Sequence, residues 1–225
     1  VASIPFQWHH HPECELTLTL NSRGWRFVGD HIGAYGCHDL VMLPPDMPHT
    51  WASTTPIAEE APHRAIVIWF SAAWVRQLAG VCPEYNVIDQ LLRNATRGSL
   101  FPASAGRYVE KRLQHLLSDS AYERLHATLD ILTELAGTTS TPLTTAERRS
   151  LGAAEDRSTL ARVLARLHER FDEPVRMADL AAVANVSLRT LHRVFVRHVG
   201  ETVTEYLCGL RIGRACMLQT AQVFG

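Results

Sequence analysis

Several features that would place a chain of 225 residues in other protein classes are missing here. No apolar run is long enough to cross a bilayer, and no charged-then-apolar signal peptide opens the chain. Cysteine is scarce: there are five, an odd number without CxxC spacing, which indicates free thiols rather than a disulfide framework. These absences predict a cytoplasmic protein that enters no membrane.

A strong net charge is also missing, because the formal charge is −1 and gives no nucleic-acid signal for the chain as a whole. The charges are nevertheless unevenly distributed. Residues 1–157 carry 13 basic and 17 acidic side chains, whereas residues 158–225 carry nine arginines and six acids. This asymmetry fits an acidic sensing half and a basic reading half, although an excess of three charges also arises by chance.

Apolar residues make up 46% of the chain, enough for substantial cores, and the first 70 residues follow a strand-like pattern. Leu16, Leu18 and Leu20 alternate strictly with threonines, as in a strand with two unlike faces. Turn residues separate four predicted strands, at residues 15–20, 25–29, 40–43 and 64–70. Many short strands with frequent turns predict a sandwich or barrel over about residues 1–70.

From Ser71 onward the apolar period becomes helical. Two short helices are predicted at residues 71–79 and 84–95, and two longer ones at about 104–117 and 120–136. The longer helices carry apolar stripes, made of Val109, Leu113, Leu116 and Leu117 and of Leu125, Leu129, Leu132 and Leu135. The pattern leaves two alternatives open: both stripes cover the strands, or one stripe pairs with a second subunit in a homodimer through residues 104–136.

Residues 137–157 are rich in Gly, Thr, Ser and then charged residues, and are predicted to link two domains. Beyond them, residues 177–196 have the pattern of a helix-turn-helix. The first helix is predicted at about 178–184, Asn185 supplies the turn, and Ser187 caps the second helix. The predicted core of this motif consists of Leu180, Ala181, Ala184, Val186, Leu191, Val194 and Phe195.

The outer face of the second helix is basic. Its predicted members are Arg189, His192, Arg193, Val196 and Arg197. Arginine pairs with guanine in the major groove and also holds phosphates, so this face suits DNA. The pattern alone leaves open a plain helical bundle with a solvated basic face.

A second cluster of polar residues lies near the start of the chain. His9, His11, Glu13 and Glu15 would share one side of a single strand, with His10 on the other side. With the distant His49, two histidines and a carboxylate make an ordinary ligand set for Zn, Ni, Mn or Fe. The alternative left open is a polar pocket that holds a hydroxyl-rich ligand directly, without a metal.

Residues 158–216 resemble the first half of the DNA-binding domain of the AraC/XylS family of transcription regulators. The matching stretches are residues 177–181, 186–195, 200–207 and 210–215. The resemblance implies that Arg189, His192 and Arg193 read bases and that Thr190 and Arg197 lie near phosphates. The family has two helix-turn-helix units, and this chain stops at Gly225 where the second would begin. We therefore expect this chain alone to bind operator DNA weakly, because it lacks half of the phosphate contacts.

The first half resembles a cupin. Its first motif is met by His9, His11 and Glu15, and its second by Pro44, Asp46 and His49, with Asp46 where glycine is usual. His38 likewise stands where glycine is usual before Asp39. The segment is also similar to the cupin-type sensor domains of AraC-family regulators, which implies a double-stranded β-helix that binds a small effector, commonly a sugar.

Together these features predict an α+β chain in three parts. They are a cupin-like β-barrel sensor with a helical pair over residues 1–136, a linker over 137–157, and the first half of an all-α helix-turn-helix domain over 158–225. The predicted protein is a bacterial, non-enzymatic transcription regulator whose partners are operator DNA and a small effector. The alternative is a metal-dependent cupin enzyme, an oxygenase or isomerase, with His9, His11, Glu15 and His49 as the metal ligands.

Overall fold

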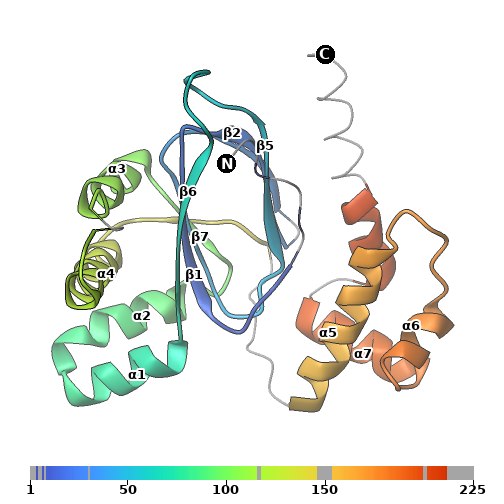
Figure 1. Cartoon of the computed structure of the whole chain (residues 1–225). Helices are drawn as coiled ribbons and strands as arrows, with labels where there is room; N and C mark the ends of the chain where they lie inside the picture. Colours follow the sequence, from blue (N-terminus) through green and yellow to red (C-terminus); the bar gives the residue numbers. More distant parts are fainter. Residues whose placement is uncertain are drawn as a thin grey trace. The chain divides into compact units, whose positions relative to one another are not determined.

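Figure 1 shows the computed structural model, which describes residues 4, 7, 9–29, 31–115, 118–145, 154–199 and 202–211. The chain divides into two compact units, Val1–Glu147 and Arg148–Gly225. It is a mixed α/β protein, with antiparallel sheets in the first unit and only helices among the described residues of the second. Across the described ranges, no helix combines the length and the apolar character needed to cross a bilayer.

Two antiparallel sheets form the β layer of the first unit, with strand orders β6-β1-β4-β7-β8 and β3-β2-β5. The strands are β1 Cys14–Leu20, β2 Arg23–Val28, β3 His31–Tyr35, β4 Asp39–Leu43, β5 His49–Thr55, β6 Arg64–Phe70, β7 Ser99–Phe101 and β8 Thr141–Pro142. The leucines of β1 belong to a core shared with the helices. Because side chains alternate along a strand, Glu15, Thr17 and Thr19 lie on the opposite face.

The helices of the first unit cover the leucine face of β1 (Figure 1). They are α1 Ala72–Val81, the short 3-10 helix η1 Pro83–Tyr85, α2 Asn86–Asn94, α3 Ala103–Arg112 and α4 Ala121–Ala136. Helix α4 begins with a capping box in which Ser120 and Glu123 each satisfy the other's backbone N–H. Its buried residues Ile131, Leu132 and Leu135 complete the core against β1.

The four predicted strands are confirmed to within two residues at each end. The closed barrel expected over residues 1–70 is not: within the described part of the chain, the pairings give two separate sheets, and the larger one takes β7 and β8 from beyond residue 70. Strands β3, β5, β7 and β8 were not predicted. Strand β7 has three residues and β8 has two, which is too short for any alternation to be visible in the sequence.

The two long helices of the first unit differ from their prediction in extent and exposure. Helix α3 ends at Arg112 rather than at residue 117, and Leu116 and Leu117 lie outside the described residues. In α4 the predicted stripe divides: Leu132 and Leu135 are fully buried, whereas Leu125 is 45% exposed. Most of this stripe therefore covers the sheet, and the homodimer through residues 104–136 stays a prediction.

The segment predicted as an inter-domain linker, residues 137–157, begins inside the first unit. Strand β8 pairs with β7, and Leu143 and Thr144 are buried. The backbone N–H of Leu143 donates to Gly98, and the Arg97 guanidinium donates to the carbonyl of Thr144. Residues 141–145 are thus part of the folded first unit rather than of a linker.

Three described non-glycine residues of the first unit lie in the left-handed region: Asn21, with φ 46°, and two residues in the predicted cupin segments. His38 has φ 62° and Asp46 has φ 60°. These are the two positions where the cupin resemblance expects glycine. The backbone therefore keeps the conformation that favours glycine although this sequence has a side chain at both positions.

A buried ion pair connects the two sheets. Arg26 of β2, only 2% exposed, donates through Nη1 to both carboxylate oxygens of Asp39 in β4. Among the described residues, the other hydrogen-bond contact of this guanidinium runs from Nη2 to Nε2 of His31, at 3.4 Å, and Nε makes no hydrogen bond to any of them. The Arg26 charge therefore depends on Asp39 for its compensation.

The second unit contains α5 Ala154–Glu169, α6 Met177–Val183 and α7 Leu188–Val199, and residues 203–211 are also helical. Apolar side chains from all four segments are buried, among them Leu164, Leu180, Phe195 and Tyr206. The rings of Phe195 and Tyr206 meet edge to face at 5.4 Å. Residues 212–225 lie outside the described residues, and they include most of the last stretch, 210–215, that resembles the AraC/XylS family.

Candidate metal centre and nucleic-acid interface

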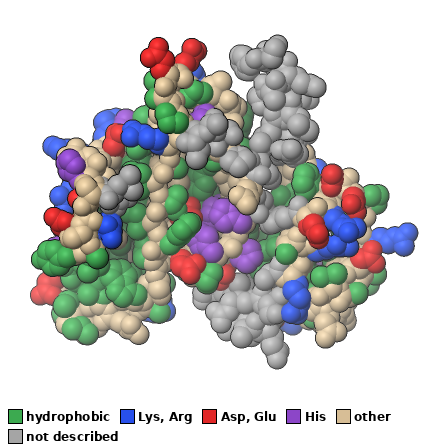
Figure 2. All heavy atoms as spheres, viewed as in Figure 1, with side chains coloured by type: hydrophobic (Ala, Val, Ile, Leu, Met, Phe, Trp, Pro, Cys, Tyr) green, Lys and Arg blue, Asp and Glu red, His purple; other side chains and the backbone are tan. Residues whose placement is uncertain are grey.

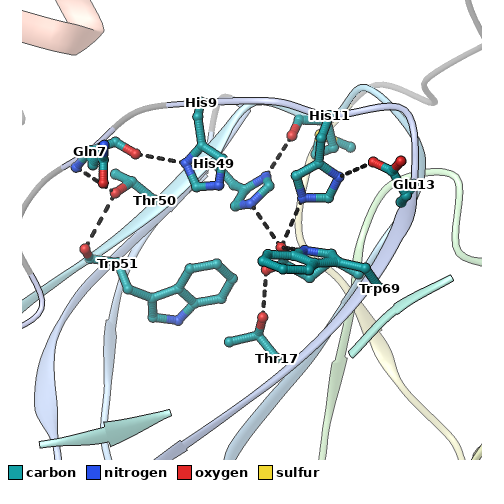
Figure 3. A network of polar contacts seen from close by, with 11 residues as sticks. Gln7, His9, His11, Glu13, Thr17, His49, Thr50, Trp51 and Trp69 are labelled. Atoms are coloured by element: carbon teal, nitrogen blue, oxygen red, sulfur yellow. Dashed lines mark hydrogen bonds and ion pairs between the residues drawn. The ribbon is translucent and has the colours of Figure 1, made fainter. Parts of the chain in front are cut away.

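Four side chains predicted as a site converge in the first unit (Figure 3). His9, His11, Glu15 and His49 each offer a ligand atom, and these atoms all lie within 4.8 Å of one another. Figure 2 shows a group of histidine side chains at the molecular surface. Within the cluster, however, His49 and Glu15 are only 1% and 3% exposed.

The sequence predicted that His9, His11 and Glu15 lie on a single strand, and this prediction is wrong. Strand β1 begins only at Cys14, and the chain bends at Pro12 and Glu13. His9 instead forms an isolated antiparallel bridge with His49 at the start of β5. The Glu13 carboxylate reaches Nδ1 of His11 at 3.5 Å from the outside, and it is not one of the four converging groups.

One carboxylate oxygen, Oε2 of Glu15, is the centre of the cluster. It accepts a hydrogen bond from Nε2 of His11 at 2.9 Å and lies 3.4 Å from Nε2 of His49. It also accepts from the indole Nε1 of Trp69 in β6, at 2.7 Å. The other oxygen, Oε1, accepts from the hydroxyl of Thr17.

Backbone carbonyls set the protonation of two of the histidines. Nδ1 of His9 donates to the carbonyl of Gln7, and Nδ1 of His49 donates to the carbonyl of Met47, each at 2.7 Å. Because a carbonyl only accepts, these Nδ1 atoms carry protons, and Nε2 of the neutral imidazole keeps its lone pair. In His49 this Nε2 is buried without a hydrogen-bond partner. An unpaired nitrogen lone pair beside a buried carboxylate fits a metal cation.

The electrostatics of the cluster favour the forms that a metal binds. Burial acts to raise the pKa of Glu15, but the hydrogen bond from His11, the nearby His49 ring and the hydrogen bond from Thr17 outweigh it and hold that pKa far below its usual value. Burial, together with the nearby His49, lowers the pKa of His9. Burial opposes the charged form of His11 as well, yet the hydrogen bond with Glu15 prevails and raises its pKa. The carboxylate is therefore ionised and His9 is neutral at pH 7.

Sequence reasoning missed two residues of this site, Trp69 and Thr17. Thr17 follows Glu15 by two positions and so shares its face of β1, a signal that the alternation already contained. Trp69 could not be found in this way, because it reaches Glu15 only through the register that pairs β1 with β6. His10 lies outside the cluster, as predicted, with its Nδ1 3.8 Å from Asp46.

The predicted helix-turn-helix is present in the second unit as α6, a short turn and α7. Asn185 has φ 56°, the left-handed conformation predicted for the turn. Ser187 caps α7, since its hydroxyl accepts from the backbone N–H of Thr190 at 3.1 Å. Arg162 of α5 holds the turn from behind by donating to the carbonyl of Ala184 at 2.9 Å.

The side chains of this motif divide into a buried and an exposed set. Leu180, Ala184, Leu191, Val194 and Phe195 are at most 2% exposed, and Ala181 is also buried, whereas Val186 is only half-buried. On the other side of α7, the exposed residues are Arg189, His192, Arg193, Val196 and Arg197. Thr190 is half-buried, and its hydroxyl shares a hydrogen bond with that of Ser187 at 2.9 Å.

The left-handed turn gives a direct stability prediction. Asn185→Ala should destabilise the second unit by about 1–2 kcal/mol, because a Cβ in this region meets the following carbonyl oxygen and alanine lacks a compensating polar side chain. Asn185→Gly, the matched control, should change the free energy of unfolding by well under 1 kcal/mol. Chemical denaturation of the two variants checks this, and equal losses for alanine and glycine would contradict it.

No family model matches this chain, and no curated protein matches it in sequence. Among solved structures it is similar to the AraC-like transcriptional activator CuxR, at 10% identity and a TM-score of 0.36, over 91% of this chain and 68% of that one. It is also similar to fatty-acid-bound ToxT from Vibrio cholerae, at 11% identity and a TM-score of 0.42, over 97% and 78%. These neighbours are AraC-like regulators, but at such scores the likeness transfers neither a site nor a ligand.

Proposed function

We propose that this chain is a DNA-binding transcription regulator whose first unit senses a small effector. The observation that carries the proposal is the outward basic face of α7, presented by the Asn185 turn and the Ser187 cap. The AraC/XylS motifs in the sequence of residues 158–216 support the same function. The effector-binding part is proposed to be cupin-like, on the motifs around His9, Glu15 and His49.

In this proposal α7 is the recognition helix that enters the major groove. Arg189, His192 and Arg193 read base edges, because guanidinium and imidazole groups match the acceptors of guanine. Thr190 and Arg197 contact phosphates. All of these except Thr190 are exposed along one face of the helix, so their side chains are accessible to a partner.

The test separates phosphate contacts from base reading. Selection from a random duplex library should enrich one sequence, and Arg193→Ala should lower the preference for it by about 1–3 kcal/mol. Arg197→Ala should instead weaken binding to all duplexes alike and reduce the slope of log affinity against log salt by about 1. Fluorescence anisotropy at several salt concentrations measures both effects.

Arg107→Ala is the matched charge control, because Arg107 is an exposed arginine of α3 in the first unit. It should leave both the sequence preference and the salt slope unchanged. If the wild-type chain enriches no sequence and shows no salt-dependent retention of duplex DNA, the proposed function is wrong. If Arg193→Ala keeps the full preference, α7 is not the recognition helix.

For the effector site, we propose a divalent transition metal held by His9, His11, Glu15 and His49. Three imidazoles and one carboxylate suit Zn, Ni, Mn or Fe, and their donor atoms already lie within 4.8 Å of one another. A bound metal would supply a fixed positive charge that the cluster's carboxylate alone lacks. A hydroxyl-rich ligand such as a sugar, held without metal, is the alternative occupant of this pocket.

A metal-dependent enzyme is the second candidate function, favoured by the same cluster. It would give no role to the arginine face of α7, which an enzyme does not need. The two candidates differ in the DNA experiment: the regulator requires sequence-selective, salt-dependent retention, and the enzyme predicts none.

A further inference from the structure

We infer that Trp69 and Thr17 are positioning residues that hold Glu15 as a one-oxygen metal ligand. This inference rests on the metal site proposed above. It concerns two side chains that are not ligands themselves. Both touch the carboxylate of Glu15, one at each oxygen.

The contacts to Glu15 fall into two kinds when a cation enters. His11 and His49 now direct their Nε2 atoms at Oε2 of Glu15, at 2.9 and 3.4 Å. As metal ligands these nitrogens must turn their lone pairs to the cation, and His11 must give up the proton it donates to Glu15. The hydrogen bond from His11 to Glu15 is therefore lost on binding.

Trp69 and Thr17 are different, because neither of them becomes a metal ligand. Their hydrogen bonds to Glu15 can therefore stay in place when the cation binds. The indole Nε1 of Trp69 donates to Oε2 at 2.7 Å, and the Thr17 hydroxyl donates to Oε1. With both oxygens anchored, the carboxylate keeps its orientation while the histidines change partners. Oε2, which already faces the imidazoles, keeps a second lone pair for the cation.

The surroundings of the two residues support this division of roles. Thr17 is 3% exposed on the polar face of β1, where a hydroxyl without an acceptor would be costly. Trp69 is 61% exposed, which is unusual for a tryptophan of a central β layer, and its ring lies edge-on to His11 at 5.9 Å. Its one polar atom, the indole N–H, donates to the metal-ligating carboxylate rather than facing water.

The experiment measures zinc affinity by competition with a chromophoric chelator and ligand geometry by the visible spectrum of the cobalt(II) form, on the full chain. Trp69→Phe removes the N–H donor and keeps an aromatic ring, although a smaller one, at an exposed position. We expect zinc affinity to fall about 10- to 100-fold and the cobalt bands to shift, as when other partners of metal ligands are removed. Thr17→Val should do the same, and Thr17→Ser, which keeps the hydroxyl, should restore wild-type affinity.

Trp25→Phe is the control for the aromatic substitution, since Trp25 lies on β2 between Ala34 of β3 and Ala52 of β5. Wild-type affinity and an unchanged cobalt spectrum in both Trp69→Phe and Thr17→Val would overturn the inference while leaving the metal site standing. A wild-type chain that binds neither zinc nor cobalt would overturn the metal site, and the inference with it. If Thr17→Val fails to fold, the exposed Trp69→Phe variant decides alone.

Discussion

Zinc is expected to raise the melting temperature of the chelator-treated wild-type protein, and His49→Ala is expected to abolish that rise. A ligand that binds only the native state stabilises it by about 2.7 kcal/mol at one hundred times its dissociation constant. For a unit of this size that corresponds to roughly 5–10 °C. His49 is the most buried of the four groups, at 1% exposed, and its Nε2 makes no hydrogen bond to another described residue.

Scanning calorimetry with and without zinc checks this, and the quantity to compare is the zinc-induced shift, not the absolute melting temperature of each variant. His115→Ala, at an exposed histidine just after α3, should keep the full shift. Adding a chelator to the zinc-loaded wild type should return it to the starting value. A shift of wild-type size in His49→Ala would exclude His49 as a ligand.

Asp39→Ala should destabilise the first unit by about 3–5 kcal/mol, the second large effect that we expect. The substitution leaves the Arg26 guanidinium buried at 2% exposure without its carboxylate. Removing one member of a buried pair costs far more than the pair contributes, because the remaining charge cannot recover its hydration. Among the described residues, the weak contact with His31 is the hydrogen-bond contact that would then remain for it.

The double variant Arg26→Met with Asp39→Leu should recover much of this loss, since buried pairs are often replaceable by apolar side chains of similar volume. Asp130→Ala serves as the surface control: it breaks the exposed pair with Arg112 and should cost less than about 1 kcal/mol. Urea unfolding of the four proteins measures all these changes. An Asp39→Ala loss no larger than that of Asp130→Ala would show that Arg26 finds compensation elsewhere.

The elements that could be predicted from the sequence are those with a local physical signature. The alternation of β1 is visible because one face contacts helices and the other is polar. Ser120 and Glu123 mark the start of helix α4 through their capping box. Asn185 and Ser187 mark the turn of the helix-turn-helix and the cap of its second helix. In each case neighbouring residues alone determine the backbone.

The elements that could not be predicted depend on distant partners. Strand β8 is two residues long and exists because Gly98 and Ser99 offer an open edge to it. The end of the first unit also depends on a distant partner. The composition of residues 137–157 predicted that it ends at residue 136, whereas residues 141–145 are part of it. Composition reports polarity, but it does not report which polar segment finds a strand to pair with.

The sequence predicted which four side chains converge, namely His9, His11, Glu15 and His49, but the reason given for their convergence was partly wrong. A single strand over His9 and Glu15 would have aligned their side chains, yet Pro12 interrupts it. The four groups meet because the His9 backbone pairs with His49 at the start of β5 and the His49 ring lies beside the carboxylate of Glu15. The residue types and their spacing identified the four side chains, whereas the tertiary pairing of distant segments determines how they are arranged.

The backbone bridge between His9 and His49 makes the amino-terminal tail a component of the site. Two of the four donor side chains are attached to residues that hydrogen-bond to each other, through His9 N–H to His49 carbonyl and the reverse, at 3.1 and 2.9 Å. A protease that trims past residue 9 would remove a donor and the clamp on its neighbour in one cut. A change in the segment around His9 is therefore expected to affect both the set of donor groups and the position of His49.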